Sequence, residues 1–112
     1  MENFYNVITY LSSRALDVNF TGQSLAVGAF DHIAIQYVVS NSSSLSGNLQ
    51  LQKSLDGSSW VNLGSVIPLS GDTVAIVTES DIKYGYIRAT YTASAGDGLL
   101  GVKVATINDT SN

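Results

Sequence analysis

Side chains that could do acid, base or nucleophilic chemistry are few in this sequence and lie far apart. The 112 residues include one histidine, nine acidic residues and no cysteine. His32 follows Asp31 where a strand is expected to begin, but no nucleophile lies at a spacing that would complete a catalytic group with it. We therefore interpret His32 as a turn or surface residue, and we expect a non-enzymatic protein without catalytic residues.

Most of the aspartates lie where turns are expected. Aspartate favours turns because its short carboxylate accepts hydrogen bonds from nearby backbone N–H groups and because it tolerates left-handed geometry. Loop carboxylates could also bind calcium, but the D-x-D-x-D-G spacing of a calcium-binding loop is absent. The sequence therefore predicts no metal site and no cofactor. The turn aspartates are Asp31, Asp56, Asp72, Asp81 and Asp97.

Aromatic side chains are the other group that could bind a ligand. Exposed tyrosine and tryptophan rings stack on sugars or anchor protein interfaces. Trp60 follows the turn at residues 56–59, where its ring could close the end of the domain or form a ligand platform. Burial is favoured, because a small domain needs bulky core residues. The candidate ligand or interface residues are Trp60, Tyr84, Tyr86, Phe4, Tyr5 and Tyr10.

The composition limits the partners that the protein can have. Charged residues make up 12% of the chain, about half of the usual ~25%, and the formal net charge is −4. Nucleic acid is not an expected partner, because the basic residues are scattered singly. No apolar stretch approaches the ~18 residues of a membrane span, and no signal peptide is visible. The basic residues are Arg14, Lys53, Lys83, Arg88 and Lys103.

Strand patterns run from one end of the chain to the other and must position these side chains. Residues 32–40 and 47–53 alternate with period two, and the polar loop 41–46 between them predicts a hairpin. Asp56-Gly57 predicts the turn of a second hairpin over residues 51–63. Further strands are predicted at 4–10, 15–20, 23–27, 73–78, 84–92 and 99–107, the last two forming a third hairpin around residues 96–98.

The fold predicted from these strands is an antiparallel β-sandwich or jelly roll with about seven to eight strands. Residues 1–112 form one domain, in which residues 1–30 match the pattern least and could serve as an assembly strand or arm. Tyr86 should face outward if Ile87 and Ala89 face inward. The predicted core residues are Ile33, Ile35, Tyr37, Leu49, Leu51, Ile76, Ile87, Ala89, Val102 and Val104.

The middle and the end of the chain resemble a known group of proteins. Residues 47–60 contain the pattern G-x-L-x-L-Q-x-S-x-D-G-x-x-W, residues 84–88 contain Y-x-Y-I-R, and a glycine-rich turn at residues 96–98 leads into the last strand. Small β-sandwich proteins from the virions of bacteriophages share these patterns, and the resemblance covers residues 31–104. Similar Ser-x-Asp-Gly-x-x-Trp turns occur in discoidin-like and other carbohydrate-binding sandwiches.

The resemblance implies a virion component that catalyses nothing. Such a protein decorates or stabilises the capsid, or forms the base of a fibre or spike, and it acts in many copies beside other virion proteins. It would be assembled in the host cytoplasm and would work as a homo-oligomer. The alternative is a carbohydrate-binding module, in which Trp60, Tyr84, Tyr86, Asp56 and Gln52 would contact the glycan.

Overall fold

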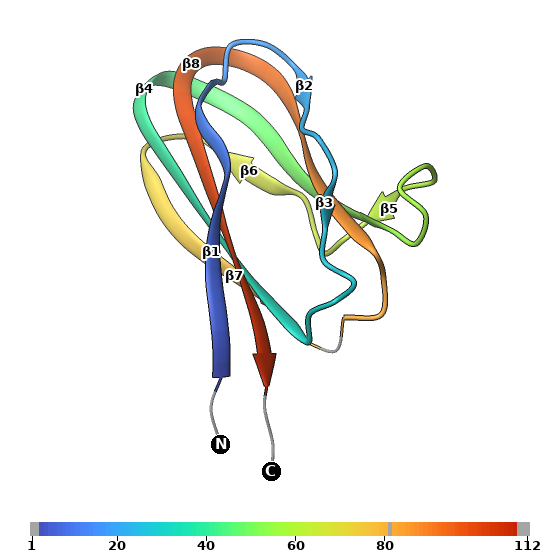
Figure 1. The fold of residues 1–112 in the computed structure, drawn as a ribbon. Helices are drawn as coiled ribbons and strands as arrows, with labels where there is room; N and C mark the ends of the chain where they lie inside the picture. The colour runs from blue at the N-terminus through green and yellow to red at the C-terminus, as the bar shows by residue number, and fades with distance from the viewer. Residues whose placement is uncertain (1–2, 81, 110–112) are drawn as a thin grey trace.

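The computed structural model describes residues 3–80 and 82–109, and within these residues it contains strands and no helix (Figure 1). All strand pairs are antiparallel, which confirms the predicted all-β class. No helix in this part of the chain could cross a membrane. The strands are β1 (Asn3–Ala15), β2 (Phe20–Thr21), β3 (Leu25–Ala26), β4 (His32–Ser54), β5 (Val61–Asn62), β6 (Ile67–Leu69), β7 (Thr73–Glu79) and β8 (Tyr86–Asp109).

Two long strands, β4 with 23 residues and β8 with 24, pair from one end of β4 to the other. Their register runs from His32 opposite Ile107 to Ser54 opposite Tyr86, and it shifts only around residues 40–47 of β4. The hairpins predicted around residues 41–46 and 96–98 are therefore wrong. Both segments are bends within continuous strands, and register shifts of this kind bend and twist a strand pair without reversing it.

The bend divides the strands into two layers (Figure 1). In the first sheet, β1 pairs with the second half of β8, which pairs with the first half of β4, and β7 pairs with the other side of β4. In the second sheet, β2 and β3 pair with the first half of β8, while β5 and β6 pair with the second half of β4. The result is a β-sandwich, and the predicted hairpin over residues 51–63 is confirmed by the pairing of β4 with β5.

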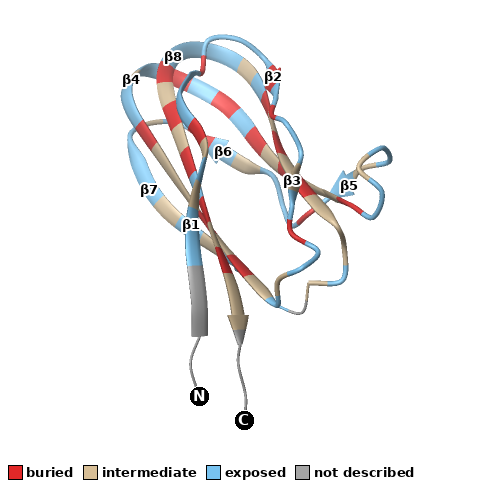
Figure 2. Cartoon of the chain, viewed as in Figure 1, coloured by how far each residue is buried: buried red, intermediate tan, exposed pale blue. Residues whose placement is uncertain are grey.

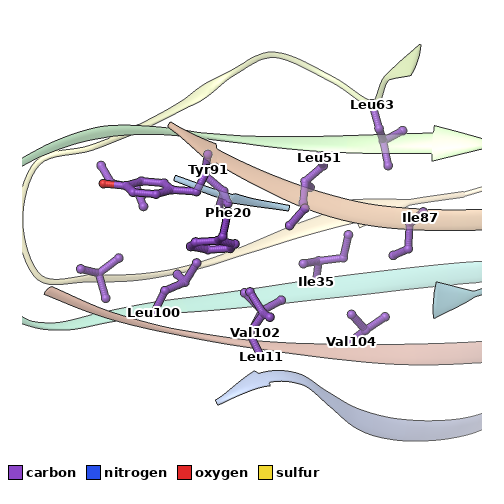
Figure 3. Close-up of a cluster of buried hydrophobic side chains, with 14 of the residues drawn as sticks. Leu11, Phe20, Ile35, Leu51, Leu63, Ile87, Tyr91, Leu100, Val102 and Val104 are labelled. Carbon is purple, nitrogen blue, oxygen red and sulfur yellow. The ribbon is translucent and has the colours of Figure 1, made fainter. Parts of the chain in front are cut away.

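Buried apolar side chains from both sheets fill the space between the layers (Figures 2 and 3). Eight of the ten predicted core residues are buried, whereas Tyr37 is only half-buried at the edge of the core. Ile76 is 62% exposed, so its predicted core position is wrong. In β7 the smaller Ala75 and Val77 turn inward instead, because both faces of this strand are apolar and the alternation does not fix which face is buried.

The N-terminal segment is part of the same sandwich. Strand β1 pairs with β8 from Asn3 opposite Asp109 to Ala15 opposite Leu99, with two register shifts between Thr9 and Arg14. The predicted strand at residues 15–20 is wrong: β1 ends at Ala15, and Phe20 begins the two-residue β2. Leu11, Leu16 and Phe20 are buried in the core. Removing residues 1–13 would thus strip an edge strand from the first sheet.

Candidate functional site

Three polar side chains line up across the outer face of the second sheet. Gln52 of β4 lies opposite Asn62 of β5 on one side and opposite Arg88 of β8 on the other. Gln52 and Arg88 point outward because they alternate with the buried Leu51 and Ile87. The Arg88 Nε donates a hydrogen bond of 2.8 Å to Gln52 Oε1, and the Gln52 Nε2 lies 3.5 Å from Asn62 Oδ1.

Trp60 covers the arginine of this row. The Arg88 guanidinium carbon lies 4.3 Å from the centre of the Trp60 ring, which is the geometry of a cation–π contact. Trp60 is half-buried, so the structure supports neither full burial nor a free-standing ring. Trp60, Arg88, Gln52 and Asn62 together form what we call the Trp60 face. It offers one ring, one cation and two amide groups, a set that can stack on and hydrogen-bond a polar ligand.

The loop after β4 holds Trp60 in place. The Asp56 carboxylate accepts hydrogen bonds from the backbone N–H groups of Ser58 (2.9 Å) and Ser59 (3.0 Å) and from the Ser54 hydroxyl (3.0 Å). These bonds, with the Ser59 bond the largest contribution, hold the pKa of Asp56 below its usual value. Gly57 adopts a φ of +81°, which suits glycine. Asp56 therefore acts as the turn residue that the sequence predicted.

Tyr84 lies on a different surface from the Trp60 face. It lines a hollow of about 400 Å³ together with Lys53, Lys83, Leu55 and Val61, and Trp60 is not part of this lining. The Lys53 Nζ lies 5.4 Å from the centre of the Tyr84 ring. The sequence did not indicate this hollow, because Lys53 and Lys83 are thirty residues apart and only the sheet brings them together.

The remaining predicted residues have separate positions. Tyr86 faces outward, as predicted, and its ring packs against Gly57 in the Asp56 loop. The Tyr10 hydroxyl accepts the Ala89 N–H at 3.1 Å and donates to the Gln23 carbonyl at 2.5 Å, so it ties β1 to the second sheet within the chain. Burial raises the pKa of Tyr10. The side chains of Phe4 and Tyr5 lie outside the described residues.

Alkaline titration should report on Tyr84. Burial, and to a lesser degree the Glu79 carboxylate, raises its pKa from 10.0 to about 12. Its hydroxyl is buried and has no hydrogen-bond partner in the described part of the chain. Below pH 10 the hydroxyl is neutral in the folded and unfolded states. Between pH 10 and 12 the unfolded state releases the proton first, so stability falls as pH rises.

The Tyr84→Phe variant should therefore lose less stability than the wild type between pH 10 and 12. At pH 7 its free energy of unfolding should equal or exceed the wild-type value, because the buried hydroxyl that it lacks has no hydrogen-bond partner in the described part of the chain. Urea unfolding at a series of pH values measures both the stability at pH 7 and its decline between pH 10 and 12. Some decline should persist in the variant, because burial also raises the pKa of Tyr10 and Tyr91. Parallel pH profiles for the two proteins would contradict the prediction.

The strand pairing and the shared core define this protein as an antiparallel β-sandwich. No model of a known protein family matches its sequence, and no curated protein sequence matches it. Solved structures do match. The crystal structure of the SPBc2 prophage-derived protein YomS superposes with a TM-score of 0.62 at 16% identity, and the match covers 96% of each chain.

Two other matches are to parts of longer chains. The PBSX exported protein XepA superposes with a TM-score of 0.64 at 9% identity, over 96% of this chain and 38% of XepA. The VP2 subviral particle of infectious bursal disease virus superposes with a TM-score of 0.55 at 15% identity, over 95% of this chain and 32% of that chain. This chain thus spans nearly all of YomS and only about a third of each of the other two chains. At these identities the matches establish a shared fold.

Proposed function

We propose that this protein is a non-enzymatic structural component of a bacteriophage virion. The observation that carries the proposal is the fold itself, which is matched over almost the whole of a prophage-derived protein and over part of a protein from a viral particle. Within this class, we propose that the protein decorates or stabilises the capsid or forms the base of a fibre or spike. It would be assembled in the host cytoplasm and would remain on the particle.

The surface of the protein suits repeated packing against other virion proteins. The centres of protein interfaces are poor in lysine, glutamate and aspartate and rich in aromatic residues and arginine. The Trp60 face has this character, because Trp60 and Arg88 lie among the uncharged Gln52 and Asn62. Low charge also reduces the free energy needed to remove the surface from water. We therefore expect contacts with other virion proteins and with further copies of this chain.

Purified particles provide the test of the virion proposal. Phage particles from cells that encode this chain should contain it at a fixed copy number per major capsid protein, measured by quantitative mass spectrometry after density-gradient purification. Antibody labelling in electron micrographs should place it on the outside of the shell or at a fibre base. Absence of the chain from intact, infectious particles would overturn the proposal.

A carbohydrate-binding module is the second candidate, and the Trp60 face favours it. Tryptophan beside amide side chains is a common surface for a sugar ring. A glycan array with the wild-type protein tests this candidate, and Trp60→Ala should then abolish any signal, whereas Tyr84→Ala on the separate hollow should leave it unchanged. If the protein binds no glycan and is present in particles, the virion role remains as the single candidate function.

A further inference from the structure

The sandwich has several exposed sheet edges, and most of them are unsuited to pairing with another strand. An unpaired edge can add a foreign strand unless it is short, bulged, charged or interrupted by proline. Strands β2, β3 and β5 contain two residues each, and β6 contains Pro68. Strand β1 is long, but two register shifts break it between Thr9 and Arg14, so that only residues 3–9 form an uninterrupted edge there.

Strand β7 lacks these protections except for a single charge, Glu79, at its last residue. It pairs with β4 at every residue from Thr73 to Glu79 without a register shift, and it pairs with no other described strand. Figure 2 shows it at the margin of the sandwich. Residues 73–78 read T-V-A-I-V-T, with no charge, proline or glycine and with five β-branched side chains. Val74 and Ile76 are 63% and 62% exposed on the outer face of this edge.

We infer that β7 pairs with β7 of a second copy of this chain, antiparallel and around a two-fold axis at Ile76. This register places Ile76 opposite Ile76, Val74 opposite Thr78 and Ala75 opposite Val77 of the second copy. In this register the outer face of β7 in one copy is continuous with the outer face of β7 in the second copy. The first sheets of the two copies therefore become one continuous sheet. The inference deepens the proposed function by naming the surface through which copies meet.

Charge favours a second copy as the occupant of this edge. The only ionisable residue of β7 is Glu79, and the register places it opposite Thr73, so the two carboxylates lie at opposite ends of the paired strands. The two exposed Ile76 side chains contact each other across the axis, and contacts between side chains directly opposite each other on neighbouring strands stabilise a sheet. No like charges meet anywhere along the pair.

The expected association is weak for isolated molecules. One seven-residue strand with two large exposed side chains on each copy buries less surface than a permanent dimer does, so we expect a dissociation constant on the order of 10–100 µM. Where copies are held side by side on a particle, their high effective concentration would drive the same pairing to completion.

Single-cysteine crosslinking tests the register, because the natural chain contains no cysteine. Opposed residues in antiparallel strands lie about 4.5–5.5 Å apart between Cα atoms, which is within disulfide range. Ile76→Cys should therefore form a disulfide-linked dimer under mild oxidation at least about tenfold faster than Val74→Cys or Thr78→Cys. Those two controls lie on the same face of β7, but each cysteine would be about 13 Å from the same cysteine of the second copy.

A charge at the axis provides a second measurement. Light scattering at increasing concentration should show the wild-type mass rising above 11.8 kDa, whereas Ile76→Lys, which places two lysines together, should stay monomeric. Val66→Lys, at a position that is 50% exposed outside β7, should associate like the wild type. Unchanged melting temperatures would show that the variants fold, since both side chains are exposed.

Several outcomes would overturn the inference. A wild-type mass that stays at 11.8 kDa at millimolar concentration would exclude the dimer. Equal crosslinking of all three cysteine variants would exclude the two-fold register, and preferential crosslinking of Ile76→Cys to a Val7→Cys chain would place β1 of the second copy on this edge instead. None of these results tests the virion proposal, which depends on the presence of the chain in particles.

Discussion

Replacing Gly96 by alanine is expected to lower the free energy of unfolding by about 4 kcal/mol or more, which is enough to unfold a domain of ordinary stability. Gly96 has a φ of +71° at the bend of β8. A Cβ atom there would overlap the backbone carbonyl oxygens of Ser43 and Ser44 in the bend of β4. These atoms are backbone, so they could move only if the paired bend of the two long strands were distorted.

Gly64→Ala is the matched control for this variant. Gly64 has nearly the same backbone conformation, with a φ of +74°, but no atom lies within 4 Å of the position that a Cβ would take. Its substitution should therefore show only the cost of the left-handed conformation, about 1–2 kcal/mol. Urea unfolding of both variants measures the difference. Equal losses would show that the bend of β4 does not constrain Gly96.

Replacing Leu51 or Ile87 by alanine is expected to lower the free energy of unfolding by about 2–5 kcal/mol. Both side chains lie in the core between the sheets, with exposed fractions of 5% and 4% (Figure 3). The two residues come from β4 and β8, the central pair of the second sheet. Each truncation removes buried methyl groups and leaves a cavity that the paired backbones cannot close.

Leu55→Ala controls for the loss of leucine itself. Leu55 lies just after β4 and is 77% exposed, so its truncation should change stability by less than about 0.5 kcal/mol. Denaturant unfolding monitored by circular dichroism measures all three variants. If Leu51→Ala and Ile87→Ala unfold like the wild type, the inward and outward faces of the second sheet are reversed.

The sequence patterns predicted the strands and their buried faces better than they predicted how the chain turns. Alternation correctly placed Leu49 and Leu51 in the core because only one face of that segment is apolar. In β7 both faces are apolar, so nothing in the pattern favoured Ala75 over Ile76 as the buried residue. The turn residues at Asn41, Ser44 and Gly96 do adopt positive φ angles. Such angles occur in hairpin turns and in strand bulges alike, so local chemistry could not reveal that both strands continue.

The candidate site was only partly predictable for a related reason. The sequence singled out Trp60 and Tyr84 as candidate ligand or interface residues, but the partner of each depends on strand register. Arg88 reaches Trp60 because β8 lies beside β4, and Lys83 shares a hollow with Lys53 because the chain returns to the same end of the sheet. Contacts between residues that are 28 or 30 positions apart in the sequence leave no periodic trace along it.

The pairing of β8 with four other strands has a consequence for the kinetics of folding. Strand β8 is the last of the eight in chain order, and it hydrogen-bonds β1, β2, β3 and β4. Contacts such as Val7 with Ala105 close loops of nearly one hundred residues, and high contact order of this kind slows folding to the order of milliseconds to seconds. During synthesis neither sheet can form its central pair until residues 86–109 have left the ribosome. Strands β1, β2 and β3, which pair with β8 and with no other described strand, must therefore wait unpaired. A chaperone that shields them would raise the yield of native protein more than one that accelerates a later step.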